Sequence, residues 1–353
     1  MHHAPLAGTA GPGAAGTGPA PECGDEVTTR PWPSAAQNRA AAPATAAARR
    51  RQGQVRGADR HRSVRRGAQR RAGGAAQRQV RAGAGPQTAT PVNTLDLNTR
   101  IGENLPAALA AAWGGGPALD ASLWPTEAPD TTLVARAQAE LARRLGCGQA
   151  HEPQAWKSGG PSREAALGHA ALPPRGVRRS PATLDDLRLN RPGIEAEIAL
   201  RLGQDVDAAS AATLDGLQAT ALVDGMAVSA ELVSSRWLQA QAAPAWLRQV
   251  DALSHGALVL GDWLPPQTGR DWAQQTCEIQ RNDEAPQRAR GSHSLGDPFW
   301  LLPQWLRHAT REGQVLPAGS VVTTGAWLVM PDLAAGDRLW VRFEGLGEVQ
   351  VQL

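Results

Sequence analysis

The sequence predicts an α+β fold in which strands predominate over a few helices, preceded by a disordered tail. From about residue 95 onward, Leu, Val and Trp occur at ordinary core frequency, and about 260 residues are ample for one large core. Most of the elements expected in this part are strands, and the segment at 193–202 alternates apolar and polar residues, which is typical of a strand. Strands and helices do not alternate regularly along the chain, and this disfavours a doubly wound parallel sheet.

The tail, residues 1–91, is dominated by Ala, Gly, Pro, Arg and Gln and has almost no Leu, Ile or Phe. Such a segment cannot bury enough apolar surface to offset its chain entropy, so we expect it to be disordered. It contains 14 Arg against four acidic residues, a net charge of +10, whereas the remainder carries 22 basic and 29 acidic residues, a net charge of −7. The sequence therefore predicts two regions, a tail at 1–91 and one folded domain at 92–353.

The Arg-rich stretch at 49–81 is the one segment with the charge to contact nucleic acid through phosphates. No aromatic residues interleave with it and no folded nucleic-acid module is visible, so a nucleic-acid partner is not expected. The three cysteines, Cys23, Cys147 and Cys277, form no metal or disulfide pattern, which favours a reduced, cytoplasmic location. No apolar run reaches the ~18 residues of a membrane span, and no secretory signal is evident.

Two helices are predicted at the start of the folded part. Residues 104–113 are rich in Ala and Leu and stop at a run of three glycines. Residues 131–145 place apolar side chains on one stripe at helical spacing. Asp130 suits the N-cap of this second helix, and Gly146 suits the position after its last turn.

The central part is predicted to contain strands joined by irregular segments. The clearest strand is at 193–202, where apolar and polar residues alternate strictly. Its Glu and Arg residues and one Ala face one side, and its Ile and Leu residues and another Ala face the other. In chain order, we expect a short strand at 156–159 that runs into a glycine loop, a Pro-rich irregular flap at 161–192, the alternating strand at 193–202, a connecting segment at 214–217, and strands at 220–226 and 228–237.

The C-terminal part is predicted to be mostly β, with one helix. Asp297 would cap this helix, Pro298 would occupy its first position, Pro303 would kink its axis, and Gly313 would close it. In chain order, the expected strands are a buried one at 257–261, a hairpin at 277–281 and 287–291, and three at 320–324, 338–343 and 348–353.

Glu195 and Glu197 share one face of the strand at 193–202, with Cα atoms roughly 6.6 Å apart. Like charges so placed repel unless they are solvated, protonated or share a cation. A shared divalent metal is the functional interpretation and a solvated strand face is the structural one; spacing alone favours the solvated face. Glu231, on a later predicted strand, supplies a third carboxylate, and three carboxylates suit an octahedral Mg²⁺ or Mn²⁺ site.

Lys157 is the single lysine of the 353-residue chain and directly precedes a glycine loop where a ligand can approach the backbone. An ammonium is a compact point charge whose pKa moves readily on burial, which Arg cannot match. A functional lysine and a surviving surface lysine are both compatible with this position.

Taken together, these segments resemble the fumarylacetoacetate hydrolase superfamily, and more closely its branch of 2-keto-4-pentenoate hydratases and related decarboxylases. The resemblance covers roughly residues 95–353 and rests on the joint order of several motifs. These motifs are Trp-Lys-Ser-Gly at 156–159, Gly-Ile-Glu-Ala-Glu-Ile-Ala at 193–199, Glu-Leu-Val-Ser-Ser-Arg at 231–236, and the segments at 254–261, 295–298, 321–325 and 335–337.

The resemblance implies a mixed β-roll with flanking helices and a catalytic domain at 92–353. It implies a Mg²⁺ or Mn²⁺ site, a catalytic lysine and a homo-oligomer that takes a small 2-oxo carboxylate as substrate. The residues it assigns are Glu195, Glu197 and Glu231 to the metal, Lys157 to catalysis, and Ser158, Gly159, Thr324 and Gly325 to substrate binding. The implied reaction adds water to a 2-hydroxydienoate through a metal-stabilised enolate, as in aromatic catabolism.

Three departures from the family pattern leave the reaction open. Family hydratases often carry an acid after the lysine loop, but residues 172–177 contain none, and Asp185 and Asp186 are the candidate substitutes. Ala252 stands where an Asn is usual, and residues 326–329 are bulkier than in the family. A C–C hydrolase or decarboxylase of acylpyruvate-like acids, and a catalytically silent binding protein, therefore remain as alternatives to the hydratase.

Overall fold

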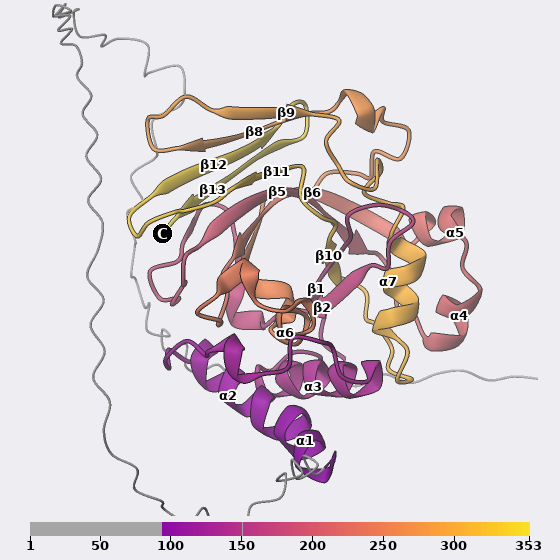
Figure 1. Cartoon of the computed structure of the whole chain (residues 1–353). Coiled ribbons are helices and arrows are strands. Elements are labelled where there is room, and N and C mark those ends of the chain that lie inside the picture. The colour runs from indigo at the N-terminus through magenta and orange to yellow at the C-terminus, as the bar shows by residue number, and fades with distance from the viewer. Residues whose placement is uncertain (1–93, 150) are drawn as a thin grey trace, which may run out of the picture. The chain divides into compact units, whose positions relative to one another are not determined.

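The computed structural model describes residues 94–149 and 151–353, in two mixed β-sheets with helices on their flanks (Figure 1). The predicted tail at 1–91 lies outside the described residues. The predicted α+β fold, a mixed β-roll with flanking helices, is confirmed for the described part.

The larger sheet has eight strands, in the order β2-β1-β10-β5-β6-β7-β3, with β11 also paired to β5. Its centre is the antiparallel pair β5–β6, and β1 runs parallel to β10. The strands of this sheet are β1 (Ala155–Gly159), β2 (Gly168–Ala171), β3 (Val177–Arg179), β5 (Gly193–Leu202), β6 (Val223–Val233), β7 (His255–Leu260), β10 (Val321–Thr323) and β11 (Leu328–Met330).

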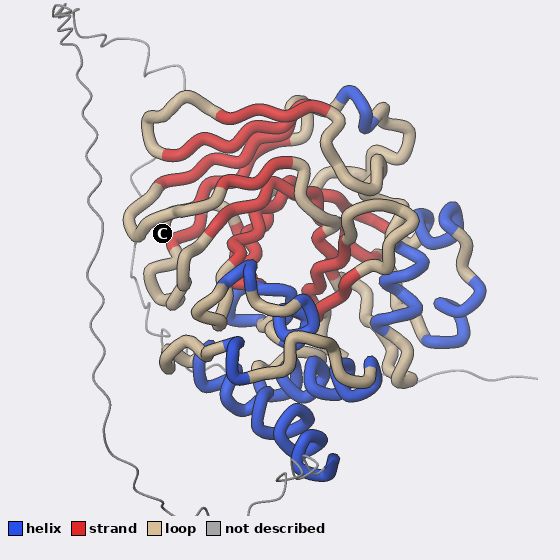
Figure 2. The backbone as a smooth tube through the Cα atoms, viewed as in Figure 1, coloured by secondary structure: helices blue, strands red, loops and turns tan. Residues whose placement is uncertain are grey.

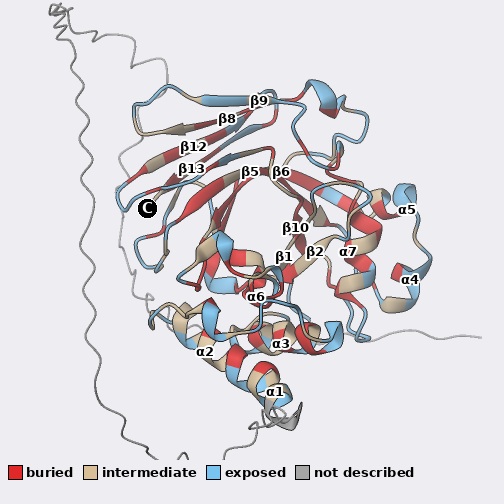
Figure 3. Cartoon of the chain, viewed as in Figure 1, coloured by how far each residue is buried: buried red, intermediate tan, exposed pale blue. Residues whose placement is uncertain are grey.

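The smaller sheet has five strands in the order β4-β13-β12-β8-β9. Apolar residues of β5 and β6 and of this sheet join in one core, and Figure 3 shows how much of β5 and β6 is buried. The strands are β4 (Ala182–Thr183), β8 (Thr276–Arg281), β9 (Gln287–Arg290), β12 (Arg338–Phe343) and β13 (Gly347–Gln352).

The helices form two groups (Figure 2). Helices α2, α3 and α6 pack together around a separate apolar cluster that includes Leu105, Leu141 and Trp246, while α4 and α5 contact α7. The helices are α1 (Thr94–Thr99), a π-helical turn (Arg100–Asn104), α2 (Leu105–Trp113), α3 (Thr131–Arg144), α4 (Ala208–Thr213), α5 (Gly216–Ala221), α6 (Ala245–Val250) and α7 (Leu302–Ala309). Single 3₁₀ turns lie at Ala121–Leu123, Pro174–Gly176, Ala240–Ala242, Ala252–Ser254 and Trp272–Gln274. No described helix is long and apolar enough to span a membrane.

Several predicted elements agree with the structure, within a residue or two at their ends. The helices at 104–113 and 131–145 correspond to α2 and α3, and the Asp130 side chain accepts from the Thr132 backbone as the predicted cap. The strand at 193–202 is β5, and the predicted hairpin is β8–β9.

Other predicted elements were wrong. The strands expected at 220–226 and 228–237 are one continuous strand, β6. The first residues of that range belong to the helix α5 instead. Asp215 and Gln218 form a capping box that begins α5, so the segment predicted as a connection at 214–217 contains a helix start. The expected flap at 161–192 contributes β2, β3 and β4 to the two sheets.

The last predicted helix is shorter than expected. It begins at Leu302, and Asp297 instead accepts from the backbone N–H of Phe299 in the preceding turn. Pro303 therefore lies in the first turn of α7, where a missing N–H costs nothing and no kink results.

A buried carboxylate cluster as candidate active site

Three carboxylates meet at the centre of the larger sheet. The antiparallel register places Glu195 of β5 directly opposite Glu231 of β6, and Glu197 lies two residues along the same face of β5. One oxygen from each side chain lies within 4.8 Å of the others. Glu197 and Glu231 are buried and Glu195 is half-buried, so the solvated-face interpretation does not hold.

Lys157 reaches this cluster from β1. The register Lys157↔Thr323↔Ala199 across β1, β10 and β5 places the lysine on the face that carries the glutamates. Its Nζ lies 2.5 Å from Oε1 of Glu231 and donates a second, longer bond of 3.3 Å to the carbonyl of Leu253. The single lysine of the chain is therefore the counter-charge of the buried cluster.

The hydrogen bonds given to Glu197 are concentrated on one of its oxygens. The hydroxyl of Thr323 and the backbone N–H of Gly325, at 3.2 Å, both donate to Oε2 of Glu197. Thr323 shares a hydroxyl contact of 3.1 Å with Ser229 on β6. These bonds fix the orientation of the carboxylate toward its neighbours.

Glu231 shows the same one-sided bonding more clearly. Lys157 and His255 both contact Oε1, whereas Oε2 is buried and has no hydrogen-bond partner. A buried carboxylate oxygen without a partner is costly, and a hard cation among three carboxylates would satisfy it. The residues present therefore fit a divalent ion such as Mg²⁺ or Mn²⁺.

The charges of the cluster shift its pKa values in opposite directions. Burial, and then repulsion from neighbouring carboxylates, raises the pKa of Glu197 well above its ordinary value, and burial also raises the pKa of Glu195. Burial would also raise the pKa of Glu231, but the adjacent Lys157 and His255 outweigh it and lower that pKa. Burial would lower the pKa of Lys157, but the three carboxylates raise it, so the ammonium stays charged.

A cavity of about 310 Å³ opens onto the cluster. Six of the residues predicted for the site line it, together with Leu253, Ser294, Ala326 and Gly160. The six are Lys157, Ser158, Gly159, Glu195, Glu197 and Gly325.

Two predicted residues sit differently from the others. Glu231 belongs to the cluster but is not among the residues that line the cavity. Thr324 is fully buried, and its hydroxyl donates to the carbonyl of Ile198 rather than facing the cavity. The hydroxyl of Ser158 is likewise paired, at 2.8 Å, with Nδ1 of His169.

Sequence reasoning missed His255, Thr323 and Leu253. His255 and Leu253 depend on the turn at Ala252–Ser254, in which three successive non-glycine residues have positive φ angles. No residue type in that segment signals a left-handed conformation, so the sequence carries no sign of it. Thr323 carried a weaker signal, because it was part of a predicted strand next to Thr324.

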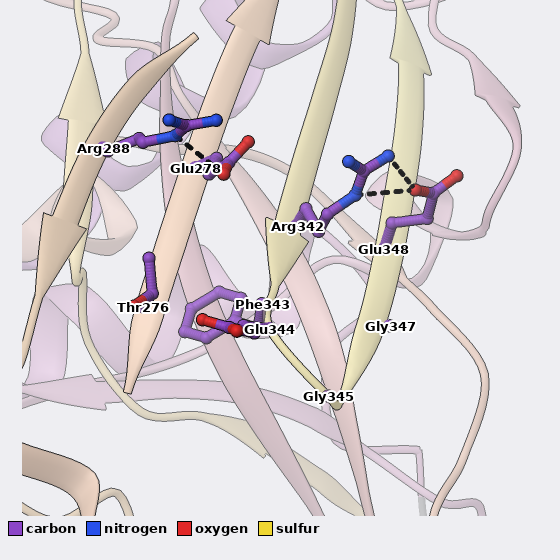
Figure 4. Close-up of a pocket in the computed structure, with 9 residues that line it drawn as sticks. All are labelled: Thr276, Glu278, Arg288, Arg342, Phe343, Glu344, Gly345, Gly347 and Glu348. Atoms are coloured by element: carbon purple, nitrogen blue, oxygen red, sulfur yellow. Dashed lines mark hydrogen bonds and ion pairs between the residues drawn. The ribbon is translucent and has the colours of Figure 1, made fainter. Parts of the chain in front are cut away.

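A second cavity, of about 650 Å³, lies on the smaller sheet and has a different character (Figure 4). Two of its three carboxylates, Glu278 and Glu348, each pair with an arginine at 2.8 Å, Arg288 and Arg342 respectively, and the third, Glu344, is exposed. Paired, partly exposed carboxylates have their charge met by the protein, so this cavity lacks the feature that characterises the buried cluster.

Comparison with known proteins places the same residues in a family. Residues 137–353 match the family described as fumarylacetoacetate (FAA) hydrolase C-terminal. The chain is 33% identical over 171 residues to 2-keto-4-pentenoate hydratase 1 of Dechloromonas aromatica (strain RCB), and 29% identical over 169 residues to 2-keto-4-pentenoate hydratase of Paraburkholderia xenovorans (strain LB400). Each match covers 46% of this chain and 60% of the relative, so the chain spans about 60% of the length of these relatives.

Solved structures support the fold. The chain is similar to 4-oxalocrotonate decarboxylase from Pseudomonas putida G7, in a complex with magnesium and adipate, with a TM-score of 0.58 and 18% identity. That match covers 74% of this chain and 99% of the other, and the complex of the same enzyme with calcium and acetate gives a TM-score of 0.57. At this identity the likeness concerns the fold alone.

Proposed function

The chain belongs to the fumarylacetoacetate hydrolase family, and from that premise we propose that it is a divalent-metal-dependent lyase acting on a small 2-oxo acid. Membership confirms the resemblance that the sequence motifs indicated. The proposed reaction is the addition of water to a 2-hydroxydienoate of the 2-keto-4-pentenoate type. One observation carries the proposal: a buried three-carboxylate cluster with an unpartnered oxygen on Glu231, at the floor of a small cavity.

The proposed metal ligands are Glu195, Glu197 and Glu231, with Mg²⁺ or Mn²⁺ as the ion because both prefer oxygen ligands. A bound divalent ion supplies Lewis-acid stabilisation of the negative charge that develops on the keto oxygen as the enolate forms. The protein holds two of the three carboxylates in place before the ion arrives, through Thr323 and Gly325 on Glu197 and through Lys157 on Glu231.

Lys157 is the proposed catalytic residue of the chain. Its charged ammonium lies at the cavity wall, where it can hold the carboxylate of the substrate or carry a proton at Nζ. Gly159 and Gly325 let the substrate approach the backbone, and their backbones lie close together, since a Cβ built on Gly159 would be 3.5 Å from Cα of Gly325. We assign Ser158 to shaping this wall and Thr324 to supporting the adjacent Gly325, because their hydroxyls already have protein partners.

Decarboxylation or C–C hydrolysis is the second candidate, and one observation favours decarboxylation of the two. Among the described residues, the cavity wall offers no acid beyond the glutamates of the cluster, and neither Asp185 nor Asp186 lines it. Such a wall has no additional carboxylate to activate a water molecule, which a hydratase of this kind would use. Decarboxylation needs only the stabilised enolate and a proton donor such as Lys157.

Turnover of 2-hydroxypenta-2,4-dienoate tests the first candidate. The full chain with Mg²⁺ should deplete the ultraviolet absorbance of the freshly made dienol, and Glu197→Gln should not. Glu278→Gln, in the separate cavity, is the matched control and should behave as wild type. Release of CO₂ or a carboxylic acid from oxaloacetate or acylpyruvates, without dienol loss, would favour the second candidate. Metal binding without turnover of any 2-oxo acid would indicate a silent binding protein.

We also propose that residues 92–353 carry the activity, that the protein is a homo-oligomer and that it acts in the cytoplasm. The family resemblance supports the oligomer, and the absence of a cysteine pattern supports a reducing compartment. Light scattering on the purified chain, and turnover by a chain that starts at residue 92, would test the first two.

A further inference from the structure

His255 opens β7 directly behind the carboxylate cluster and is fully buried. Its Nδ1 lies 3.0 Å from Oε1 of Glu231, the same oxygen that Lys157 contacts at 2.5 Å. An ionised carboxylate has no hydrogen to give, so Nδ1 of the imidazole is the donor. Two donors therefore converge on one oxygen of Glu231.

Because both donors contact Oε1, the other oxygen of Glu231 is the one left without a protein partner. With Oε1 held from two sides, the carboxylate cannot rotate without breaking a buried hydrogen bond. Oε2 is buried and has no partner in the protein. The pair of donors thus leaves Oε2 as the one oxygen of Glu231 without a protein partner, in a side chain that has an oxygen within 4.8 Å of oxygens of Glu195 and Glu197.

The backbone that delivers His255 is strained. Ala252, Leu253 and Ser254 have φ angles of 47°, 56° and 60°, all in the left-handed region. That conformation is unfavourable for L-residues other than Asn and Asp, because Cβ approaches the following carbonyl oxygen. The turn places the carbonyl of Leu253 at Nζ of Lys157 and the ring of His255 at Glu231, so it serves both donors at once.

A buried ion pair holds this turn in place. The guanidinium of Arg236 donates from Nε to Oδ1 of Asp251 at 2.6 Å and from Nη1 to the carbonyl of His255 at 2.6 Å. Asp251 directly precedes the left-handed residues and His255 directly follows them. Both ends of the strained turn are therefore tied to one arginine.

Trp113, the last residue of α2, contacts this turn and the arginine that holds it. Its Nε1 donates to Oδ1 of Asp251 at 3.2 Å, and its ring stacks on that of His255 at 6.2 Å between centroids. The guanidinium of Arg236 lies 3.9 Å from the centre of the same indole ring. Trp113 lies outside the residues that match the family, 137–353, so this support comes from a part of the chain beyond the match.

We propose that His255 is a positioning residue for the metal-binding carboxylate: it fixes Glu231 with Oε2 toward the ion, while Trp113 and the Arg236–Asp251 pair hold the turn that carries it. The proposal rests on the metal site of the proposed function. It assigns His255 no contact with substrate. Partners of this kind, which orient a ligand from behind, are typically worth 10–100-fold in metal affinity.

The test measures the Kd of Mn²⁺ for the metal-free full chain, by calorimetry or by the electron paramagnetic resonance signal of free Mn²⁺. His255→Leu removes the donor at similar size and should raise the Kd by about 10–100-fold. His255→Asn keeps an N–H near the position of Nδ1 and should recover most of the affinity. His308→Leu, a histidine stacked on His169 away from the cluster, is the matched control and should leave the Kd unchanged.

The outcomes separate positioning from mere structural support. Melting temperatures in EDTA report folding, so a purely structural role would lower them without moving the Mn²⁺ affinity of folded protein. Equal Kd values for wild type and His255→Leu would overturn the positioning role and leave the metal site standing. No Mn²⁺ binding by wild type would overturn both. If the Leu variant does not fold, His255→Gln, which moves the donor outward by one bond, replaces it in the comparison with His255→Asn.

Discussion

Glu195 of β5 lies directly opposite Glu231 of β6, so two carboxylates occupy one cross-strand position in the centre of a buried sheet. Like charges placed directly opposite each other destabilise a sheet. Lys157 forms its direct ion pair with Oε1 of Glu231, and this single positive charge faces three carboxylates. The fold therefore tolerates an electrostatic conflict here that a second cation would resolve.

Glu197→Gln should be more stable than wild type without metal and less stable than wild type with metal. In EDTA the variant should melt above wild type, by about 1 kcal/mol in unfolding free energy, because a buried carboxylate with a raised pKa becomes a neutral isostere. With Mn²⁺ at about 100 times its Kd, wild type should gain about 2.7 kcal/mol and the variant should gain little.

Differential scanning fluorimetry in EDTA and in Mn²⁺ measures this crossing. Glu278→Gln removes a carboxylate that is paired with Arg288 in the other cavity, and should keep the full response to Mn²⁺. A Glu197→Gln variant that gains as much from Mn²⁺ as wild type does would contradict the proposed metal site.

Lys157→Met should destabilise the metal-free protein by about 3 kcal/mol, because removal of one partner leaves a buried charge on Glu231 uncompensated. Turnover should fall to background, since the methionine carries neither charge nor proton. Arg342→Met breaks a half-exposed pair with Glu348 and should cost less than about 1 kcal/mol. Urea unfolding compares the two losses, and equal losses would count against a buried ion pair at Lys157.

The sequence predicted the site residues whose positions follow from local sequence spacing. It did not predict those whose positions depend on contacts between segments that are distant in the sequence. The alternation of β5 placed Glu195 and Glu197 on one face, and the glycine loop marked Lys157. The opposition of Glu195 to Glu231 depends on a register that neither strand specifies alone. His255 depends on a left-handed turn built from Ala, Leu and Ser, which local propensity disfavours.

The errors in the fold have similar causes. The strand predicted at 220–226 overlooked the capping box of Asp215 and Gln218, although both residues are visible in the sequence. Pro303 was assigned to a helix interior because Asp297-Pro298 imitates a helix start. In the first case a local helix-start signal was overlooked, and in the second a local helix-start signal was misleading.

Gly325→Ala should weaken Mn²⁺ binding as well as stability. Gly325 has φ of +101°, which an alanine adopts only with strain, and its N–H donates to Oε2 of Glu197. Gly336→Ala introduces comparable strain at φ of +89°, where a Cβ would meet nothing within 4 Å. Both variants should lose about 1–2 kcal/mol of stability, and only Gly325→Ala should lose metal affinity. Equal Mn²⁺ Kd values in the two variants would remove Gly325 from the site.

The pH dependence of stability should reflect the stacked pair His169 and His308, whose ring centroids lie 4.4 Å apart. Burial lowers the pKa of His169 to about 4, and burial together with His169 lowers the pKa of His308 to about 3. Both rings are neutral in the folded chain at pH 5, whereas the unfolded chain binds protons below about pH 6.5. Stability is therefore fully present above pH 6.5 and is lost as the pH falls toward 4, at up to about 1.4 kcal/mol per pH unit for each histidine.

His308→Phe keeps a ring against His169 and Trp156 but cannot titrate, so it should remove the share of His308 and reduce this slope by roughly half between pH 6.5 and 4. Urea unfolding across that range in EDTA measures it without interference from metal. The exposed His151 provides the control, because His151→Asn also accepts the positive φ of that position and should leave the slope as in wild type. A His308→Phe slope equal to that of wild type would mean that His308 does not contribute to acid sensitivity.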